Sequence, residues 1–205
     1  MLKNDNLLIN NIDAFSLTYI LPDESNEDIL WLAGINTGLI KYHKKNGVIN
    51  QYKDSSLINT YTNCMEFDGS GNLWIGTNMG LYKFDLAAND FTSYTIEEGL
   101  TNNFINSILV DDNNNLWIST NKGLNKINTS NEEIRRFTRA DGIMGYQFNI
   151  NSSLKLDNGD MLFGSTNGIT SFNPEKIVET RNNVNEVVIG DISVGKIRLF
   201  IMAKS

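Results

Sequence analysis

The chain has 205 residues, 40% hydrophobic and 20% charged, a balance typical of a folded globular protein rather than a disordered one. Its net charge of −7 argues against a nucleic-acid surface and a polybasic membrane contact, and leaves neutral or cationic partners open. The single cysteine, Cys64, excludes an internal disulfide and a cysteine-based metal cage.

Residues 1–13 are predicted to form an N-terminal lead. They lack the basic start and the apolar run of a signal peptide. No stretch of the chain reaches the ~18 apolar residues that a membrane span needs. The chain alone is therefore expected to stay in the cytoplasm, without direct membrane contact.

A repeat organises the rest of the sequence. Trp31, Trp74 and Trp117 recur at intervals of 43 residues, and the segment 72–85 returns at 115–128 with nine of its fourteen residues identical. A weaker copy places Leu162 in the tryptophan position. Self-similarity at this period indicates stacked structural units, which we place at 14–56, 57–99, 100–142 and 143–178.

Each unit reads as four short strands separated by Gly, Asn and Asp turns. In the third unit the predicted strands are 105–110, 116–120, 124–127 and 134–138. Four antiparallel strands in a unit of this length are typical of a propeller blade. We therefore predict an all-β fold: a partial β-propeller of about four four-stranded antiparallel blades, with a short extended C-terminal tail at 179–205.

The recurring residues are assigned structural roles. A tryptophan at one strand position can fill the wedge between neighbouring sheets, whereas an aromatic platform for a sugar would require an exposed ring. The recurring glycines are expected to adopt positive φ in turns rather than to form a phosphate loop. This predicted structural set consists of Trp31, Trp74, Trp117, Gly38, Gly80, Gly123 and Gly168.

From Gly99 to Ile127 the sequence resembles the two-component regulator propeller repeat. The carrying residues are Gly-Leu-Thr-Asn at 99–102, the strand that ends at Asp111, and Asn-Leu-Trp-Ile-Ser-Thr at 115–120. The last blade resembles the terminal blade of such propellers, and the tail resembles the start of the immunoglobulin-like sandwich domain that follows them.

The resemblance implies a periplasmic sensor region of hybrid two-component regulators in glycan-degrading bacteria, where the propeller passes a ligand signal to a kinase. The chain departs from that plan in lacking a signal peptide, enough blades to close a ring, a complete sandwich domain, and a kinase or DNA-binding module. Kinase activity is therefore not expected, and the chain looks like a fragment.

No catalytic residue, metal site or cofactor is predicted. His43 lies in a cationic turn rather than on a dimerising helix, and a single histidine leaves no base for a serine triad. The acidic turns beginning at Asp68 and Asp111 could suggest calcium, but they lack EF-hand spacing and are expected to cap themselves. Cys64 is expected to be a small buried hydrophobe.

If a small molecule binds, loops at one end of the blades are the expected place, because loops on a rigid scaffold carry function. Amides, Arg and Tyr suit sugar hydroxyls, although the asparagines could simply supply turn geometry. The candidate ligand residues are Asn36, Asn78, Asn121, Asn167, Glu97, Glu98, Asn102, Arg139, Tyr146 and Gln147.

These observations favour a non-catalytic sensor segment of a two-component regulator that senses a glycan in the parent protein. The alternative is a structural or protein-interaction propeller fragment, which contacts other blades or self-associates through its open edges. A propeller lyase or hydrolase is the third reading, and it would need convergent acid and base groups.

Overall fold

The computed structural model describes residues 16–143, 146–177, 192–194 and 197–199. Within these ranges the regular secondary structure is nearly all β-strand, which confirms the all-β prediction. The helical segments there are two short 3-10 turns, η1 (Arg139–Asp141) and η2 (Pro174–Lys176), and no helix of the described ranges is long and apolar enough to cross a membrane.

The two predicted ends of the chain fall largely beyond these ranges. The lead at 1–13 lies outside the described residues, as does most of the tail at 179–205. In the tail the structure describes a hairpin of β16 (Ile192–Val194) and β17 (Ile197–Leu199).

Four sheets follow one another along the chain, each an antiparallel meander of neighbouring strands. Sheet 1 contains β1 (Ser16–Pro22), β2 (Ile29–Ile35), β3 (Leu39–His43) and β4 (Gly47–Tyr52). Sheet 2 contains β5 (Thr62–Phe67), β6 (Asn72–Thr77), β7 (Leu81–Asp85) and β8 (Asp90–Tyr94). Sheet 3 contains β9 (Ile105–Val110), β10 (Asn115–Thr120), β11 (Gly123–Asn128) and β12 (Ile134–Phe137). Sheet 4 has three strands in the described part of the chain, namely β13 (Phe148–Lys155), β14 (Met161–Ser165) and β15 (Gly168–Phe172).

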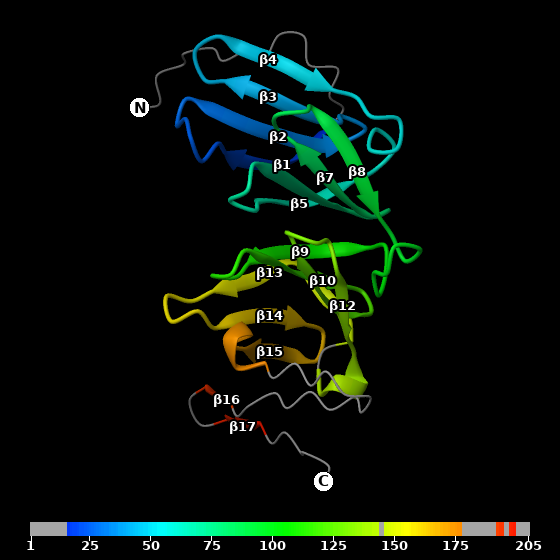
Figure 1. The fold of residues 1–205 in the computed structure, drawn as a ribbon, viewed down its shortest axis with the longest axis vertical. Helices are drawn as coiled ribbons and strands as arrows, with labels where there is room; N and C mark the ends of the chain where they lie inside the picture. The colour runs from blue at the N-terminus through cyan, green and yellow to red at the C-terminus, as the bar shows by residue number, and fades with distance from the viewer. Residues whose placement is uncertain (1–15, 144–145, 178–191, 195–196, 200–205) are drawn as a thin grey trace.

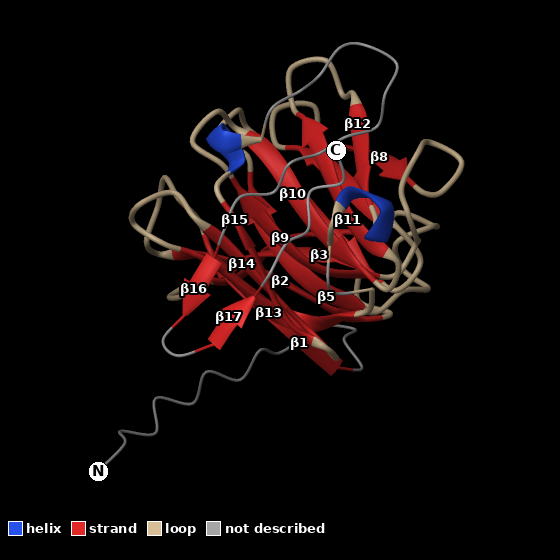
Figure 2. Ribbon diagram, turned by 90° about the horizontal axis from the view of Figure 1, so that it is seen from below, coloured by secondary structure: helices blue, strands red, loops and turns tan. Residues whose placement is uncertain are grey.

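The first strands of the sheets lie side by side. β1 contacts β5, β5 contacts β9, and β9 contacts β13. Figure 1 shows the sheets succeeding one another from sheet 1 near the top to sheet 4 near the bottom, and Figure 2 shows the same strands from below. Inner strands that meet while the later strands fan outward are the arrangement of a propeller, so the predicted partial propeller is confirmed.

The tryptophans fill the wedges between sheets. Trp31, Trp74 and Trp117 are each 1% exposed. Trp31 packs against Phe84 of sheet 2 with ring centroids 5.9 Å apart, and Trp117 packs against Phe172 of sheet 4 at 4.6 Å. Since a buried indole removes roughly 150–250 Å² from water, these rings are major contacts between blades.

The strand register gives each sheet two distinct faces. In β6, Leu73 and Ile75 pack in the core shared with sheet 1, whereas Trp74 packs in the core shared with sheet 3. Opposite each tryptophan on the third strand lies a lysine, whose Nζ is 5.2–5.9 Å from the ring centroid. These pairs are Trp31 with Lys41, Trp74 with Lys83, and Trp117 with Lys126.

Each of these indoles also donates a hydrogen bond to a carboxylate. The Oδ2 atoms of Asp23, Asp68 and Asp111 accept hydrogen bonds from the tryptophan Nε1 of the same sheet at 2.8, 2.9 and 2.9 Å. The Oδ1 atom of Asp68 also accepts from the backbone N–H groups of Ser70 and Asn72. The prediction that Asp68 and Asp111 cap their own turns is confirmed. The same two carboxylates also orient the wedge residues Trp74 and Trp117.

Two of the recurring glycines form a matched pair for a stability test. Gly123 and Gly168 start the third strand of their sheets with φ of 122° and 131°. A Cβ at Gly123 would lie 2.4 Å from the carbonyl oxygen of Phe137, whereas a Cβ at Gly168 would have nothing within 4 Å.

We expect Gly168→Ala to cost about 1–2 kcal/mol of unfolding free energy, from backbone strain alone. Gly123→Ala should cost about 1–3 kcal/mol more, because its new methyl group also overpacks against backbone. Urea unfolding followed by tryptophan fluorescence measures both values. Equal costs for the two variants would contradict the steric argument.

Candidate functional site

One end of the sheets carries all the loops that join consecutive blades and all the loops that join second and third strands. Because antiparallel strands alternate in direction, both kinds of loop emerge at the same end. We call this end the connecting-loop face. Its loops are 36–38, 53–61, 78–80, 95–104, 121–122, 138–147 and 166–167, apart from 144–145, which lie outside the described residues.

Two of the predicted asparagines of this face form hydrogen bonds that hold their turns to neighbouring segments. The Asn78 backbone N–H donates to the Tyr61 carbonyl oxygen at 3.1 Å, and the Asn78 Oδ1 atom accepts from the Tyr61 N–H at 2.8 Å. The Asn121 Oδ1 atom accepts from Asn106 Nδ2 at 3.0 Å. Asn36 adopts a positive φ of 55°. These contacts favour the interpretation that the asparagines shape and join the loops.

Asn167 is displaced by one position from the others. The hydroxyl groups of Thr120 and Ser165 each donate to the carbonyl oxygen of the residue three positions later. This shared bond shows that Thr120 and Ser165 occupy equivalent positions in their turns. Asn121 directly follows Thr120, whereas Asn167 is the second residue after Ser165. The two asparagines therefore do not occupy equivalent places.

The acidic loop of the connecting-loop face is held by internal bonds. The Glu98 carboxylate accepts hydrogen bonds from the backbone N–H and the hydroxyl of Thr95, both at 2.7 Å. These bonds lower the pKa of Glu98, and the bond from the hydroxyl has the larger effect. The Asn102 Oδ1 atom accepts from the N–H of Phe104, and the Glu97 N–H donates to the Thr95 hydroxyl. These groups stabilise the loop that leads into sheet 3.

Arg139 and Tyr146 come together in the loop that leads into sheet 4. The guanidinium carbon of Arg139 lies 5.2 Å from the centroid of the Tyr146 ring, a cation–π contact, and Tyr146 is 44% exposed. The neighbouring Gln147 carbonyl oxygen accepts from the Thr166 N–H, so its backbone ties this loop to the 166–167 turn. This pair offers a flat ring and a cation toward solvent.

Sequence reasoning missed three exposed apolar side chains on the same face. Tyr61 is 50% exposed, Met79 57% and Ile96 54%. Each lies in a loop among polar turn residues. A single apolar residue within such a polar loop is the feature of the sequence that could have revealed it. Together with Tyr146 they make the connecting-loop face less polar than the amide series alone suggests.

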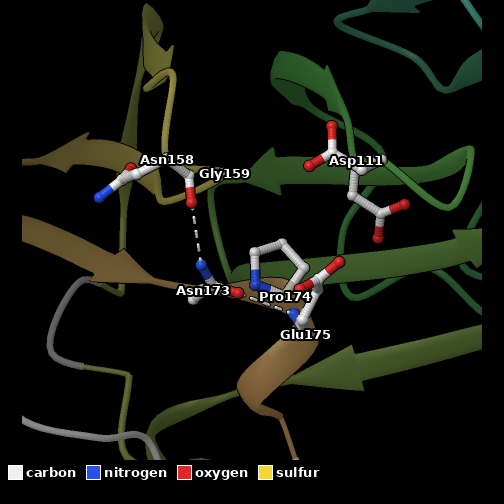
Figure 3. Close-up of a pocket in the computed structure, with 7 residues that line it drawn as sticks. Asp111, Asn158, Gly159, Asn173, Pro174 and Glu175 are labelled. Carbon is white, nitrogen blue, oxygen red and sulfur yellow. Dashed lines mark hydrogen bonds between the residues drawn. The ribbon is translucent and has the colours of Figure 1, made fainter.

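The opposite end of the sheets holds a small, partly open pocket between sheets 3 and 4. Figure 3 shows its lining from the β9–β10 turn, the β13–β14 turn and the start of η2. The lining residues are Asp111, Asp112, Asn158, Gly159, Asn173, Pro174 and Glu175.

Several polar groups of this pocket are bonded to neighbouring residues. Asp112 forms an ion pair with Lys155 at 2.7 Å, and Asn173 Nδ2 donates to the Asn158 carbonyl oxygen and to Asp160. Within the described ranges no three His, Cys, Asp or Glu side chains gather as a metal ion would require. The pocket is therefore a bonded junction between two blades.

The other reactive side chains have structural surroundings. His43 Nδ1 accepts from the backbone N–H groups of Lys45 and Asn46 at 3.1 and 3.3 Å, so the histidine caps the β3–β4 turn at the end opposite the connecting-loop face. Cys64 is 2% exposed, and burial raises the pKa of its thiol. Both arrangements agree with the structural roles predicted for these two residues.

The family comparison matches two segments of the chain. The two component regulator propeller family model matches residues 56–79 and 99–122. These segments cover the first two strands of sheets 2 and 3 and the end of the loop before each first strand. No curated protein matches the sequence.

Solved structures share the fold at low sequence identity. The extracellular domain of a hybrid two component system from B. thetaiotaomicron has a TM-score of 0.69 at 23% identity, over 91% of this chain and 27% of that chain. A one component system domain from the same organism has a TM-score of 0.61 at 20% identity, over 78% and 21%. The virginiamycin B lyase of Staphylococcus aureus has a TM-score of 0.58 at 15% identity, over 81% and 57%. This chain spans about a quarter of the length of each of the two B. thetaiotaomicron domains.

Proposed function

We propose that the chain is the non-catalytic sensor segment of a two-component regulator, because two of its segments match the two component regulator propeller model within a partial propeller. In the parent protein the segment lies outside the cytoplasm, as do the similar extracellular domains. Its ligand is a glycan, bound on the connecting-loop face.

The exposed Tyr146 ring beside Arg139 is the observation that carries this proposal. A flat apolar ring can lie against the C–H groups of a sugar while a guanidinium donates to its hydroxyls. Tyr61 adds a second exposed ring on the same face. Rigid sheets beneath the loops fix the positions of these groups, which lowers the entropy cost of binding.

The absence of catalysis is supported by the surroundings of the single histidine and of Glu98 on the connecting-loop face. The single histidine caps a turn on the opposite end, away from the connecting-loop face. The Glu98 carboxylate accepts bonds from its own loop and its pKa is lowered, which is the reverse of what a general acid needs. The likeness to a lyase is therefore a likeness of fold.

Calorimetric titration with neutral hexasaccharides of glucose, mannose, xylose and arabinose tests the proposal. We expect one of them to bind, and Tyr146→Ala to weaken that binding at least about tenfold by removing the stacking surface. Ile49→Ala is the control, because Ile49 is a 52% exposed residue on the outer strand β4.

Silence across all four sugars would favour the alternative, a propeller fragment that contacts only other protein. Binding that survives Tyr146→Ala and Arg139→Ala together would place the sugar elsewhere on the molecule. Retention of the far-ultraviolet circular dichroism spectrum in each variant excludes misfolding as the cause of a loss.

A further inference from the structure

Three asparagines of the chain directly precede a glycine, in the pairs 46–47, 158–159 and 167–168. In such a pair the backbone nitrogen of the glycine can attack the asparagine carboxamide, because glycine has no Cβ to hinder the approach and its backbone turns freely. All three asparagines are exposed, so exposure alone does not separate them. The hydrogen bonds around each pair do.

Asn158 is held by bonds on both reacting groups. Its Nδ2 atom donates to Asp160 Oδ2 at 2.9 Å, and its Oδ1 atom accepts from the Asp160 N–H at 3.1 Å. The attacking N–H, that of Gly159, donates to the Leu156 carbonyl oxygen at 2.9 Å. Asn173 Nδ2 donates to the Asn158 carbonyl oxygen at 3.4 Å (Figure 3). An attack at Asn158 therefore requires several bonds to break first.

Asn46 is restrained mainly through its backbone. Its N–H donates to the carbonyl oxygen of His43 at 3.2 Å and lies 3.3 Å from His43 Nδ1. Gly47 is partly buried and pairs with His43 at the start of β4. This turn can deform less easily than one whose asparagine and glycine are both exposed.

Asn167 has the fewest restraints of the three. Its N–H lies 3.4 Å from Ser165 Oγ, and its carboxamide has no hydrogen-bond partner among the described residues. Gly168 pairs with Ser165 at the start of β15, as Gly47 pairs with His43, but Gly168 is exposed and a Cβ built on it would have nothing within 4 Å. The 167–168 pair therefore has open space in which to adopt the reacting geometry.

We propose that Asn167 is a site of spontaneous deamidation and reacts fastest of the three Asn-Gly asparagines. The Gly168 backbone nitrogen attacks Asn167 Cγ, so that an N–Cγ bond forms and the Cγ–Nδ2 bond breaks. The proton of the Gly168 N–H passes through solvent to the departing NH2 group, which leaves as ammonia from a five-membered succinimide. One water then opens the ring at either carbonyl carbon and leaves aspartate or isoaspartate.

The one-position displacement of Asn167 creates this site. In sheets 2 and 3 the corresponding asparagines, Asn78 and Asn121, are followed by Met79 and Lys122, whose side chains hinder an attack by the backbone nitrogen. Their Oδ1 atoms also accept hydrogen bonds at 2.8 and 3.0 Å. In sheet 4 the asparagine comes one residue later and directly precedes the glycine, which makes it reactive.

The reaction changes the charge of the connecting-loop face. Each deamidation replaces a neutral carboxamide by a carboxylate in the 166–167 turn. The Thr166 N–H donates to the Gln147 carbonyl oxygen, so this turn is tied to the loop that contains Tyr146. The modified chain thus carries an added negative charge close to that loop.

Tandem mass spectrometry of the folded chain, incubated at neutral pH, measures conversion at each asparagine. We expect Asn167 to convert at least about tenfold faster than Asn158, because the bonds that must break at Asn158 raise its barrier. Asn46 should convert at an intermediate rate. In concentrated urea the three rates should become similar, since the difference comes from the fold and not from the dipeptide.

Gly168→Ala is the matched variant, because its methyl group hinders the attack without filling occupied space. It should slow conversion at Asn167 and leave the rates at Asn46 and Asn158 unchanged, which also shows that the variant is folded. Equal rates in the folded chain, faster conversion at Asn46 or Asn158, or differences that persist in urea would each overturn the proposal. No sugar enters these measurements, so their outcome is independent of the sensor proposal.

Discussion

Asp68→Ala is expected to lower the free energy of unfolding by about 3–5 kcal/mol. The Asp68 side chain is fully buried and accepts hydrogen bonds from Trp74 Nε1 and Asn72 Nδ2, as well as from two backbone N–H groups of its turn. Alanine leaves all of these donors without their acceptor in a place that water does not reach freely. Urea unfolding followed by tryptophan fluorescence measures the loss.

Asp23→Ala is the matched control. Asp23 accepts from Trp31 Nε1 at 2.8 Å, the same type of bond, but its turn at 23–28 is largely exposed. Water can replace the missing carboxylate there, so we expect a cost of about 1–2 kcal/mol. A loss at Asp68 no larger than that at Asp23 would show that burial does not set the strength of the bond.

The bond between carboxylate and indole can be isolated by a double-mutant cycle. Trp74→Phe removes the Nε1 donor and keeps an aromatic ring in the wedge. We expect a coupling free energy of about 1–3 kcal/mol between this change and Asp68→Ala, because the bond joins a buried charge to its donor. Additive costs would mean that the turn N–H groups, and not the indole, account for the effect.

Glu66 should make the protein less stable as the pH rises from about 5 to 8. Glu66 pairs with Trp74 across β5 and β6, in the row where Leu109 and Leu154 stand in sheets 3 and 4. Burial there, and next the nearby Glu24 carboxylate, raise the pKa of Glu66 to about 7, against smaller opposing effects of the Phe67 N–H and Lys155.

The sign follows from proton binding. Between the usual glutamate pKa and 7 the folded state holds a proton that the unfolded state has released, so the free energy of unfolding falls as pH rises through this window. We expect a loss of about 1–3 kcal/mol, because partial exposure of the carboxyl screens part of the shift. The charged groups that face Glu66 are Glu24 of the β1–β2 turn and Lys155 of β13, with Tyr19 of β1 beside it.

Urea unfolding at pH 5 and pH 8 measures the effect, and Glu66→Gln supplies the comparison. The glutamine keeps the shape but cannot ionise, so the difference between the two proteins should carry the whole pH dependence of Glu66. Glu66→Leu, which restores the residue type of sheets 3 and 4, should be more stable than the parent at pH 8. Parallel pH profiles for parent and Glu66→Gln would contradict the buried-acid interpretation.

The strands of the third blade show how far the sequence determines the fold. The predicted ranges 105–110, 116–120, 124–127 and 134–138 differ from the observed strands by at most one residue at an end. Short apolar runs between Gly, Asn and Asp turns define such strands locally, and the recurring tryptophans reveal their stacking. Both signals lie within one repeat and need no knowledge of distant contacts.

Features that depend on pairing register could not be foreseen in the same way. The 43-residue repeat places Glu66 at the position of Leu109, but its pairing with Trp74 appears only when β5 is aligned with β6. The bonds from Asp68 and Asp111 to the indoles had a signal, since each acid precedes its tryptophan by six residues. Reading that spacing as a contact required the turn between the two strands to be known.

The candidate ligand residues remain a prediction, because their exposure also depends on contacts between distant parts of the sequence. Which loop side chains face solvent depends on bonds between loops of different blades, such as the pair between Asn78 and Tyr61. The sequence identified Arg139 and Tyr146 by their chemistry, but it offered no means to tell an exposed Tyr61 from a buried tyrosine such as Tyr94.

The meander order of the strands has a consequence for how the protein is made. Every sheet takes its strands from one continuous stretch of chain, and each contacts the sheets next to it along the chain. A ribosome that has released sheets 1 and 2 has already released every partner that their shared core requires, so folding can advance one blade at a time. Duplication or deletion of a whole blade leaves each remaining sheet with its own hydrogen-bonding strands, which suits this architecture to growth by gene duplication.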